Sequence, residues 1–250
     1  MFVRRLSVLL VCLLAAGFLH AQDLAATCHA SSSYDVTLKP GSLLFDRPAP
    51  APFHMELQQG ILRTDGVAVK LNAENQDRLT LFERELRELA PRVRTVARNG
   101  VDIAVQALRA EAAGMGLSAA TRAELQRRLD AHAAELKRRI SISQSTHDWQ
   151  GDAANQAMNQ IASDLLPLIA ADLGQQAINA ALSGDLQTAA TLRDRATDLA
   201  TDLQPRLQRR MQVLRPQIEA LCPSIQRLAS LQQGVRGSDG QPLNLLQVSQ

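Results

Sequence analysis

The sequence predicts an α+β protein that is mostly helical, with a small N-terminal antiparallel β unit followed by long amphipathic helices packed as a hairpin or bundle. Apolar residues alternate with period 2 before residue 73, and from there they recur with the helical period of 3.6. The 250 residues are enough to bury a substantial core. We divide the chain into a signal peptide at 1–21, a β unit at 22–72, a helical domain at 73–232 and a flexible tail at 233–250, which is rich in Gly, Gln and Ser.

The first residues have the parts of a secretory signal peptide. Arg4 and Arg5 make the start positive, residues 6–18 are apolar, and Ala21 supplies a small residue at the cut. This apolar stretch is shorter than the roughly 20 residues that a membrane-spanning helix needs. We therefore expect cleavage and export to the periplasm, with an uncleaved anchor as the alternative and the exact cleavage site open. No later segment is apolar over such a length, so we expect no transmembrane span in the mature chain.

Charge and composition exclude one class of partner. The formal net charge of +2 is carried by Arg4 and Arg5 of the leader, so the mature chain is neutral. Proteins that bind nucleic acid through its phosphates need a basic excess on one face. Aromatic residues make up only 3% of the chain, so surfaces on which bases could stack are scarce. We expect no nucleic-acid partner.

Two cysteines remain after the predicted cut, Cys28 and Cys222. An even number of cysteines in an exported chain is typical of a disulfide. Such a bond would hold the first ordered segment against the last helix. Two free thiols are the alternative.

Short alternating segments predict the strands of the β unit, at 34–38, 42–45 and 53–57. In the last of these, Phe53, Met55 and Leu57 share one face. The proline-rich stretch 47–52 is expected to be an extended loop, because proline has no N–H to donate to a strand ladder. The clearest local signal is Asp65-Gly66, which predicts a β-hairpin over 61–71 because glycine readily adopts the positive φ of a primed turn.

A long apolar stripe predicts the first helix, from about residue 73 to Gly114. Pro91 is expected to bend this helix, and Asn99-Gly100 to interrupt it.

Three more helical segments follow. The first opens with a capping box at Thr121 and Glu124 and runs to Ile140. After a polar connection at 141–152, helical periodicity returns over 153–182 and again over 185–231. Prolines are expected to kink or divide these two segments at Pro167, Pro205, Pro216 and Pro223.

Several short motifs occur in a characteristic order along the chain. Cys28 follows the predicted cut, the hairpin motif at 62–66 comes next, residues 71–76 lead into a long helix rich in Arg and Glu, and Cys222 lies near the end. This layout resembles the YggN-like periplasmic proteins, a family of unknown function. The resemblance implies a periplasmic location and a Cys28–Cys222 pair, and it offers no catalytic residues to carry over.

Motifs for catalysis and cofactors are absent from the sequence. It contains no His-Glu-x-x-His zinc motif, no Gly-x-Ser-x-Gly elbow and no Gly-x-x-x-x-Gly-Lys phosphate loop. We therefore expect no cofactor and no metal centre, and we favour a protein that is not an enzyme.

Two local groups are nevertheless candidate sites. His147, Asp148 and Trp149 lie in the polar connection, where an exposed tryptophan could anchor a partner or ligand; we favour the alternative, that Trp149 closes the end of the bundle. The second group is an acidic stripe with i, i+4, i+8 spacing, for which a solvated face is favoured over weak metal binding. Its members are Asp194, Asp198 and Asp202.

Three functions remain open. The favoured one is a non-enzymatic binding or interaction protein of the cell envelope. The alternatives are an envelope hydrolase, with a site that includes His147 and Asp148, and a chaperone or carrier for apolar cargo. The partner is an unidentified envelope protein or apolar ligand, and the oligomeric state is open.

Overall fold

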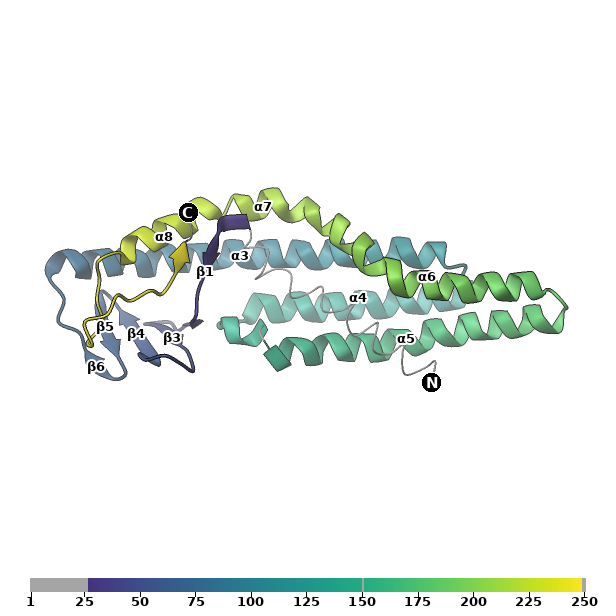
Figure 1. Ribbon diagram of the computed structural model, residues 1–250, viewed down its shortest axis with the longest axis horizontal. Helices are drawn as coiled ribbons and strands as arrows, with labels where there is room; N and C mark the ends of the chain where they lie inside the picture. Colours follow the sequence, from purple (N-terminus) through teal and green to yellow (C-terminus); the bar gives the residue numbers. More distant parts are fainter. Residues whose placement is uncertain (1–26, 150, 249–250) are drawn as a thin grey trace. The chain divides into compact units, whose positions relative to one another are not determined.

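The computed structural model describes residues 27–149 and 151–248 (Figure 1). It confirms the predicted class, because a small antiparallel sheet precedes long helices that pack together. The predicted signal peptide at 1–21 lies outside the described residues. None of the described helices combines the length and apolarity that crossing a membrane requires.

The chain divides into two compact units rather than at residue 73. The sheet unit contains the described residues 27–97, 141–149, 151 and 215–248, and the helix unit contains 98–140 and 152–214. The first long helix therefore contributes to both units. Its early turns share a core with the sheet, which a division based on periodicity could not show.

The sheet is an antiparallel meander with the strand order β2-β3-β4-β5-β6. Alternation along the strands buries one face, which includes Leu43, Phe45, Met55, Leu57 and Leu62. The strands are β2 (Asp35–Leu38), β3 (Leu43–Asp46), β4 (His54–Gln58), β5 (Ile61–Thr64) and β6 (Val67–Ala68).

The predicted hairpin is confirmed, and its turn residues Asp65 and Gly66 both have positive φ, 48° and 80°. Phe53 differs from expectation, because it is 51% exposed although it was predicted to share the buried face of Met55. It precedes the first residue of β4, and its N–H bonds to the Asp65 side chain.

Helix α3 (Ala73–Gly114) begins against the sheet. The rings of Phe45 on β3 and Phe82 on α3 lie 6.2 Å apart between centroids. Beside them, the buried Glu83 accepts the N–H of Gln59 at 2.9 Å and the guanidinium of Arg87 at 2.8 Å. A carboxylate on the helix thereby holds the β4–β5 turn in place.

The segment after α8 (Cys222–Gln232) corrects the expectation of a flexible tail at 233–250. Its apolar residues Val235, Leu243 and Leu245 are buried in the sheet unit. The buried Gln232 amide bonds both backbone groups of Leu246. Strand β7 (Gln247–Val248) then pairs with β1 (Ala30–Ser31). Because the segment is rich in Gly, Gln and Ser, its few apolar residues form no pattern in the sequence that would predict their burial.

The helix unit is built from long helices that pack through aliphatic side chains. It contains the end of α3, nearly all of α4 (Ala119–Ile142) and of α5 (Gly151–Leu182), and α6 (Leu186–Met211). Its buried cluster is Ala112, Leu117, Leu125, Leu129, Ile161 and Leu165.

Several helix boundaries differ from those predicted. Helix α3 continues through Pro91 and Asn99-Gly100, and it ends at Gly114 as expected. Helix α4 starts earlier than predicted, because the Ser118 hydroxyl accepts the N–H of Thr121 and so provides the N-terminal cap.

Of the three prolines predicted to kink or divide the last helical region, only two mark a helix boundary. Helix α6 continues through Pro205, whereas Pro216 and Pro223 lie in the first turns of new helices. After α6 come the short helices η3 (Gln212–Leu214) and α7 (Arg215–Glu219), and then α8.

Candidate functional site

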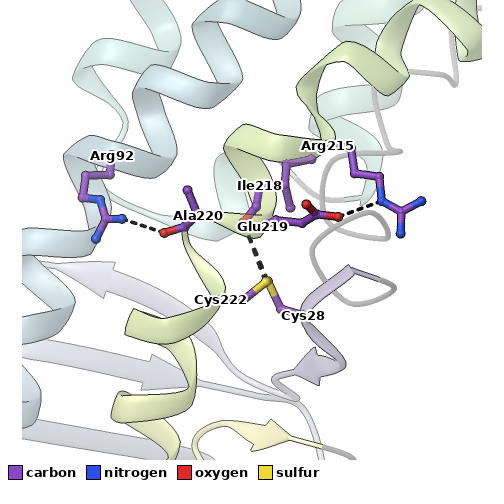
Figure 2. The surroundings of a disulfide bond; sticks show 7 residues. All are labelled: Cys28, Arg92, Arg215, Ile218, Glu219, Ala220 and Cys222. Atoms are coloured by element: carbon purple, nitrogen blue, oxygen red, sulfur yellow. Dashed lines mark hydrogen bonds and ion pairs between the residues drawn. A yellow bond between two sulfur atoms is a disulfide. The ribbon is translucent and has the colours of Figure 1, made fainter.

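The two cysteines form a disulfide in the sheet unit (Figure 2). The Cα atoms of Cys28 and Cys222 are 5.1 Å apart, within the usual range for a disulfide, and Cys28 is buried. The Ile218 carbonyl lies 3.9 Å from the Cys28 sulfur, which is a packing contact because a disulfide sulfur carries no hydrogen. The predicted bond is therefore present, and it joins the segment before β1 to the start of α8.

Helix α3 holds the residues next to this disulfide. The Arg92 guanidinium donates to the Ala220 carbonyl at 2.9 Å (Figure 2). It also donates to the Ser224 hydroxyl at 2.8 Å. These bonds anchor the turn between α7 and α8, from which Cys222 projects. The site is structural, because its polar groups bond to the protein itself.

The predicted contact residues His147, Asp148 and Trp149 lie in the short helix η2 (Thr146–Trp149) at the free edge of strand β2. Residues 143–149 close that edge. The N–H of Leu38 donates to the Gln144 carbonyl at 2.8 Å, and the N–H of Val36 donates to the Thr146 hydroxyl at 2.9 Å. Covering an edge strand in this way prevents it from pairing with another chain.

The side chains of η2 bond to different partners. His147 Nδ1 lies 3.0 Å from an Asp35 carboxylate oxygen, whereas Asp148 accepts from the Ser143 hydroxyl at 2.9 Å. The half-buried Trp149 donates its indole N–H to the same Ser143 oxygen. His147 and Asp148 are thus close in sequence but separate in their bonding, and the acid that orients His147 comes from β2.

The acidic stripe is only partly described. Asp194 is exposed, and the side chains of Asp198 and Asp202 lie outside the described residues. Within the part of the chain that the structure describes, no group of three or more His, Cys, Asp or Glu side chains is arranged to hold a metal ion.

A hollow of about 270 Å³ lies in the helix unit between α3 and α4. Its lining includes the short side chains of Ala133 and Ala134. Two ion pairs cross it, Lys137 with Asp102 and Arg109 with Asp130. These charges neutralise each other, so the hollow presents no unmatched charge that would select a ligand.

The feature that sequence reasoning missed is an exposed apolar end of the α5–α6 hairpin. Three large side chains stand out there, which we call the hairpin end: Ile178, Leu182 and Leu186, with exposed fractions of 55%, 82% and 71%. All residues from 181 to 188 are exposed. Figure 1 shows the α5–α6 turn extending past the α3–α4 turn of the same unit.

Polar bonds at the α3–α4 turn fix the base of this hairpin. The Asp172 carboxylate on α5 accepts the Ser118 N–H and the Thr121 hydroxyl, each at 2.9 Å. The Ser118 N–H, followed by the side-chain donors, lowers the pKa of Asp172 below its ordinary value. Gln176 Nε2 also donates to the Gly116 carbonyl at 3.2 Å. Helix α5 is therefore anchored at Asp172 and Gln176, just before the hairpin end begins at Ile178.

Two patterns in the sequence concern this segment, but neither reveals that it is exposed. Apolar residues of α5 are distributed around the helix instead of forming one stripe, a pattern of helices that are covered on more than one side. In the sequence, residues 151–192 contain no Lys or Arg. Exposure of the hairpin end could not be read from either pattern, because it depends on where the α3–α4 hairpin stops.

These features define a disulfide-bonded α+β protein with a covered sheet edge and an exposed apolar helical hairpin. The chain belongs to the family described as "Protein of unknown function (DUF2884)", whose sequence model matches residues 28–245. The match begins at Cys28 and includes the buried residues Val235, Leu243 and Leu245 after α8. No curated protein and no solved structure matches the chain.

Proposed function

We propose that this protein is exported to the periplasm and binds a component of the cell envelope there without catalysing a reaction, as a YggN-like protein. Two observations support export. The first residues have the composition of a cleaved secretory signal, and the Cys28–Cys222 disulfide is of the kind that persists in oxidising compartments.

The observation that carries the binding role is the hairpin end. Ile178, Leu182 and Leu186 are each more than half exposed and lie within nine consecutive residues. Isolated exposed apolar residues are ordinary, whereas a cluster of them marks an interaction surface. The bonds of Asp172 at the base of the hairpin keep this surface in a defined position.

The bonding of η2 favours binding over hydrolysis. His147 Nδ1 is paired with Asp35, and the nearby Ser145 hydroxyl accepts the backbone N–H of His147 and bonds to Thr37. A hydrolase of the serine type needs its hydroxyl to donate to the ring of the base. The polar groups of η2 bond instead to strand β2 and to one another, which supports a role in covering the sheet edge.

Site-specific photo-crosslinking in intact cells tests the binding role. A photoreactive amino acid at position 182 should give an adduct with an envelope component, whereas the same residue at position 213 should not. Val213 is the matched control because it is also in the helix unit and is 66% exposed. Equal labelling from both positions, or none from position 182, would contradict the proposal.

Fractionation of the same cells tests export. The protein should be released with the periplasmic contents, and its N-terminus should begin after residue 21 or within a few residues of it. Recovery in the cytoplasm with the leader intact would contradict export.

A further inference from the structure

We propose that the hairpin end inserts into the surface of a lipid bilayer, so that the membrane itself is the component it binds. This inference rests on the proposed binding role and names its partner. It is carried by the charge, area and shape of the surface made by Ile178, Leu182 and Leu186.

The hairpin end is almost free of charge. Between residues 173 and 192 the only charged residue is Asp185. Its carboxylate accepts the Thr188 N–H at 2.9 Å and the Thr188 hydroxyl at 2.6 Å, and these bonds lower its pKa. The charge is therefore held at the first turn of α6, where the helix dipole favours it. Asp185 is therefore the one charged group that insertion of this stretch would have to accommodate, beside neutral polar side chains such as Ser183 and Gln187.

The absence of basic residues indicates the kind of membrane contact. Amphipathic helices that depend on anionic lipids carry Lys and Arg beside their apolar face. The sequence from 151 to 192 carries neither. Insertion of the hairpin end would therefore depend on its apolar side chains, and neutral lipid should be sufficient for it.

The apolar area of the hairpin end is smaller than the surface that a stable protein interface buries. The three side chains expose on the order of 400 Å², about half of the ~800 Å² per partner that a stable protein interface buries. A lipid surface needs no such minimum, because acyl chains adapt to whatever apolar group enters the interfacial region.

The shape of the hairpin end also suits a bilayer. Leu182 and Leu186 stand on either side of the turn at Ser183 and Gly184, where the chain reverses with Gly184 at a φ of 80°, and Ile178 lies one helical turn before Leu182. A convex turn can bind a protein only if the partner supplies a matching hollow. A bilayer accepts a convex apolar group at depths of about 5–10 Å without any preformed site.

Flotation with lipid vesicles tests this inference. Mature protein from residue 22 onward, which lacks the apolar leader, is mixed with neutral phosphatidylcholine vesicles and centrifuged through a density gradient. We expect the protein to float with the vesicles at both low and high salt. The double variant Leu182→Ser/Leu186→Ser should partition at least about 50-fold less, at roughly 10-fold for each exposed leucine side chain. Val213→Ser should float as the unaltered protein does.

Three results would overturn the inference: no flotation of the unaltered protein, undiminished flotation of the double variant, or flotation that requires anionic lipid at low salt. A second measurement does not depend on that variant. In Leu182→Trp, a lipid with brominated acyl chains should quench the new tryptophan, whereas the native Trp149 of the unaltered protein should not be quenched. Equal quenching in both proteins would also refute insertion at this point.

The two proposals can fail separately. If position 182 crosslinks to a protein and the unaltered chain does not float, the binding role stands and the bilayer inference falls. If position 182 gives no adduct and the chain does not float, both fall.

Discussion

Loss of the Cys28–Cys222 bond should destabilise the sheet unit strongly. The bond joins residues separated by 194 positions, and both cysteines belong to that unit. In the chain-entropy account, closing a loop of this length lowers the conformational entropy of the unfolded chain and so stabilises the folded state by roughly 5 kcal/mol. A typical domain has only about 5–15 kcal/mol of net stability. Reduction should therefore remove a large share of the stability of this unit, or all of it.

Tryptophan fluorescence provides a selective assay. Trp149 is the single tryptophan of the chain and lies in the sheet unit, so its emission in urea reports on the unit that contains the disulfide. With a urea m value of roughly 1–3 kcal/mol/M, a loss of about 5 kcal/mol lowers the midpoint by at least about 2 M. The variant Cys28→Ala/Cys222→Ala should match the reduced protein, because both lack the same constraint.

A specific result would refute this reasoning. If the urea midpoint reported by Trp149 differs by less than about 0.5 M between the oxidised and reduced proteins, the loop closed by the bond contributes little. The sheet unit would then be held by its apolar core alone, including the packing of the segment after α8.

Three further predictions concern individual side chains. Gly60→Ala should lower the unfolding free energy by about 2 kcal/mol or more in the same assay, because Gly60 has a φ of 79° and its added Cβ would lie 2.5 Å from a backbone oxygen of α3. Gly66→Ala is the control: Gly66 has a φ of 80° but open space around it, so the substitution should cost only about 1 kcal/mol. Glu83→Gln should cost about 1–3 kcal/mol because the carboxylate is buried and accepts two donors, whereas Glu88→Gln, 67% exposed, should change stability by less than about 0.5 kcal/mol. For Glu124, hydrogen bonds from two arginines lower the pKa from 4.5 to about 2. Its contribution to the stability of α4 should therefore be complete above about pH 4.5 and be lost as the pH falls through about 2, and an NMR titration of this carboxyl that gives an ordinary pKa would contradict the pairing.

The local elements of this fold were predictable because each depends on residues close together in the sequence. Asp65-Gly66 determines its hairpin through the φ values of two adjacent residues, and the change of apolar period at residue 73 marks the start of α3. The disulfide was predictable for a different reason, since only two cysteines follow the predicted signal peptide and they have only one intramolecular pairing to form.

Other features were decided by contacts between distant residues. Asp35 pairs with His147, which lies 112 positions later, and the Gln232 amide holds Leu246 so that the segment after α8 packs and pairs with β1. Composition alone described that segment as a tail, because a few buried apolar residues in a polar stretch have no periodicity to detect.

The candidate binding surface shows the same division. The sequence alone determined that Leu182 and Leu186 are apolar and stand on either side of a turn, and that no basic residue is near them. Only the tertiary structure decided that these side chains are exposed, because the α3–α4 hairpin ends beside Asp172 and leaves the last turns of α5 uncovered. Apolarity is a property of a residue, whereas exposure depends on the lengths of the neighbouring helices and on where they pack.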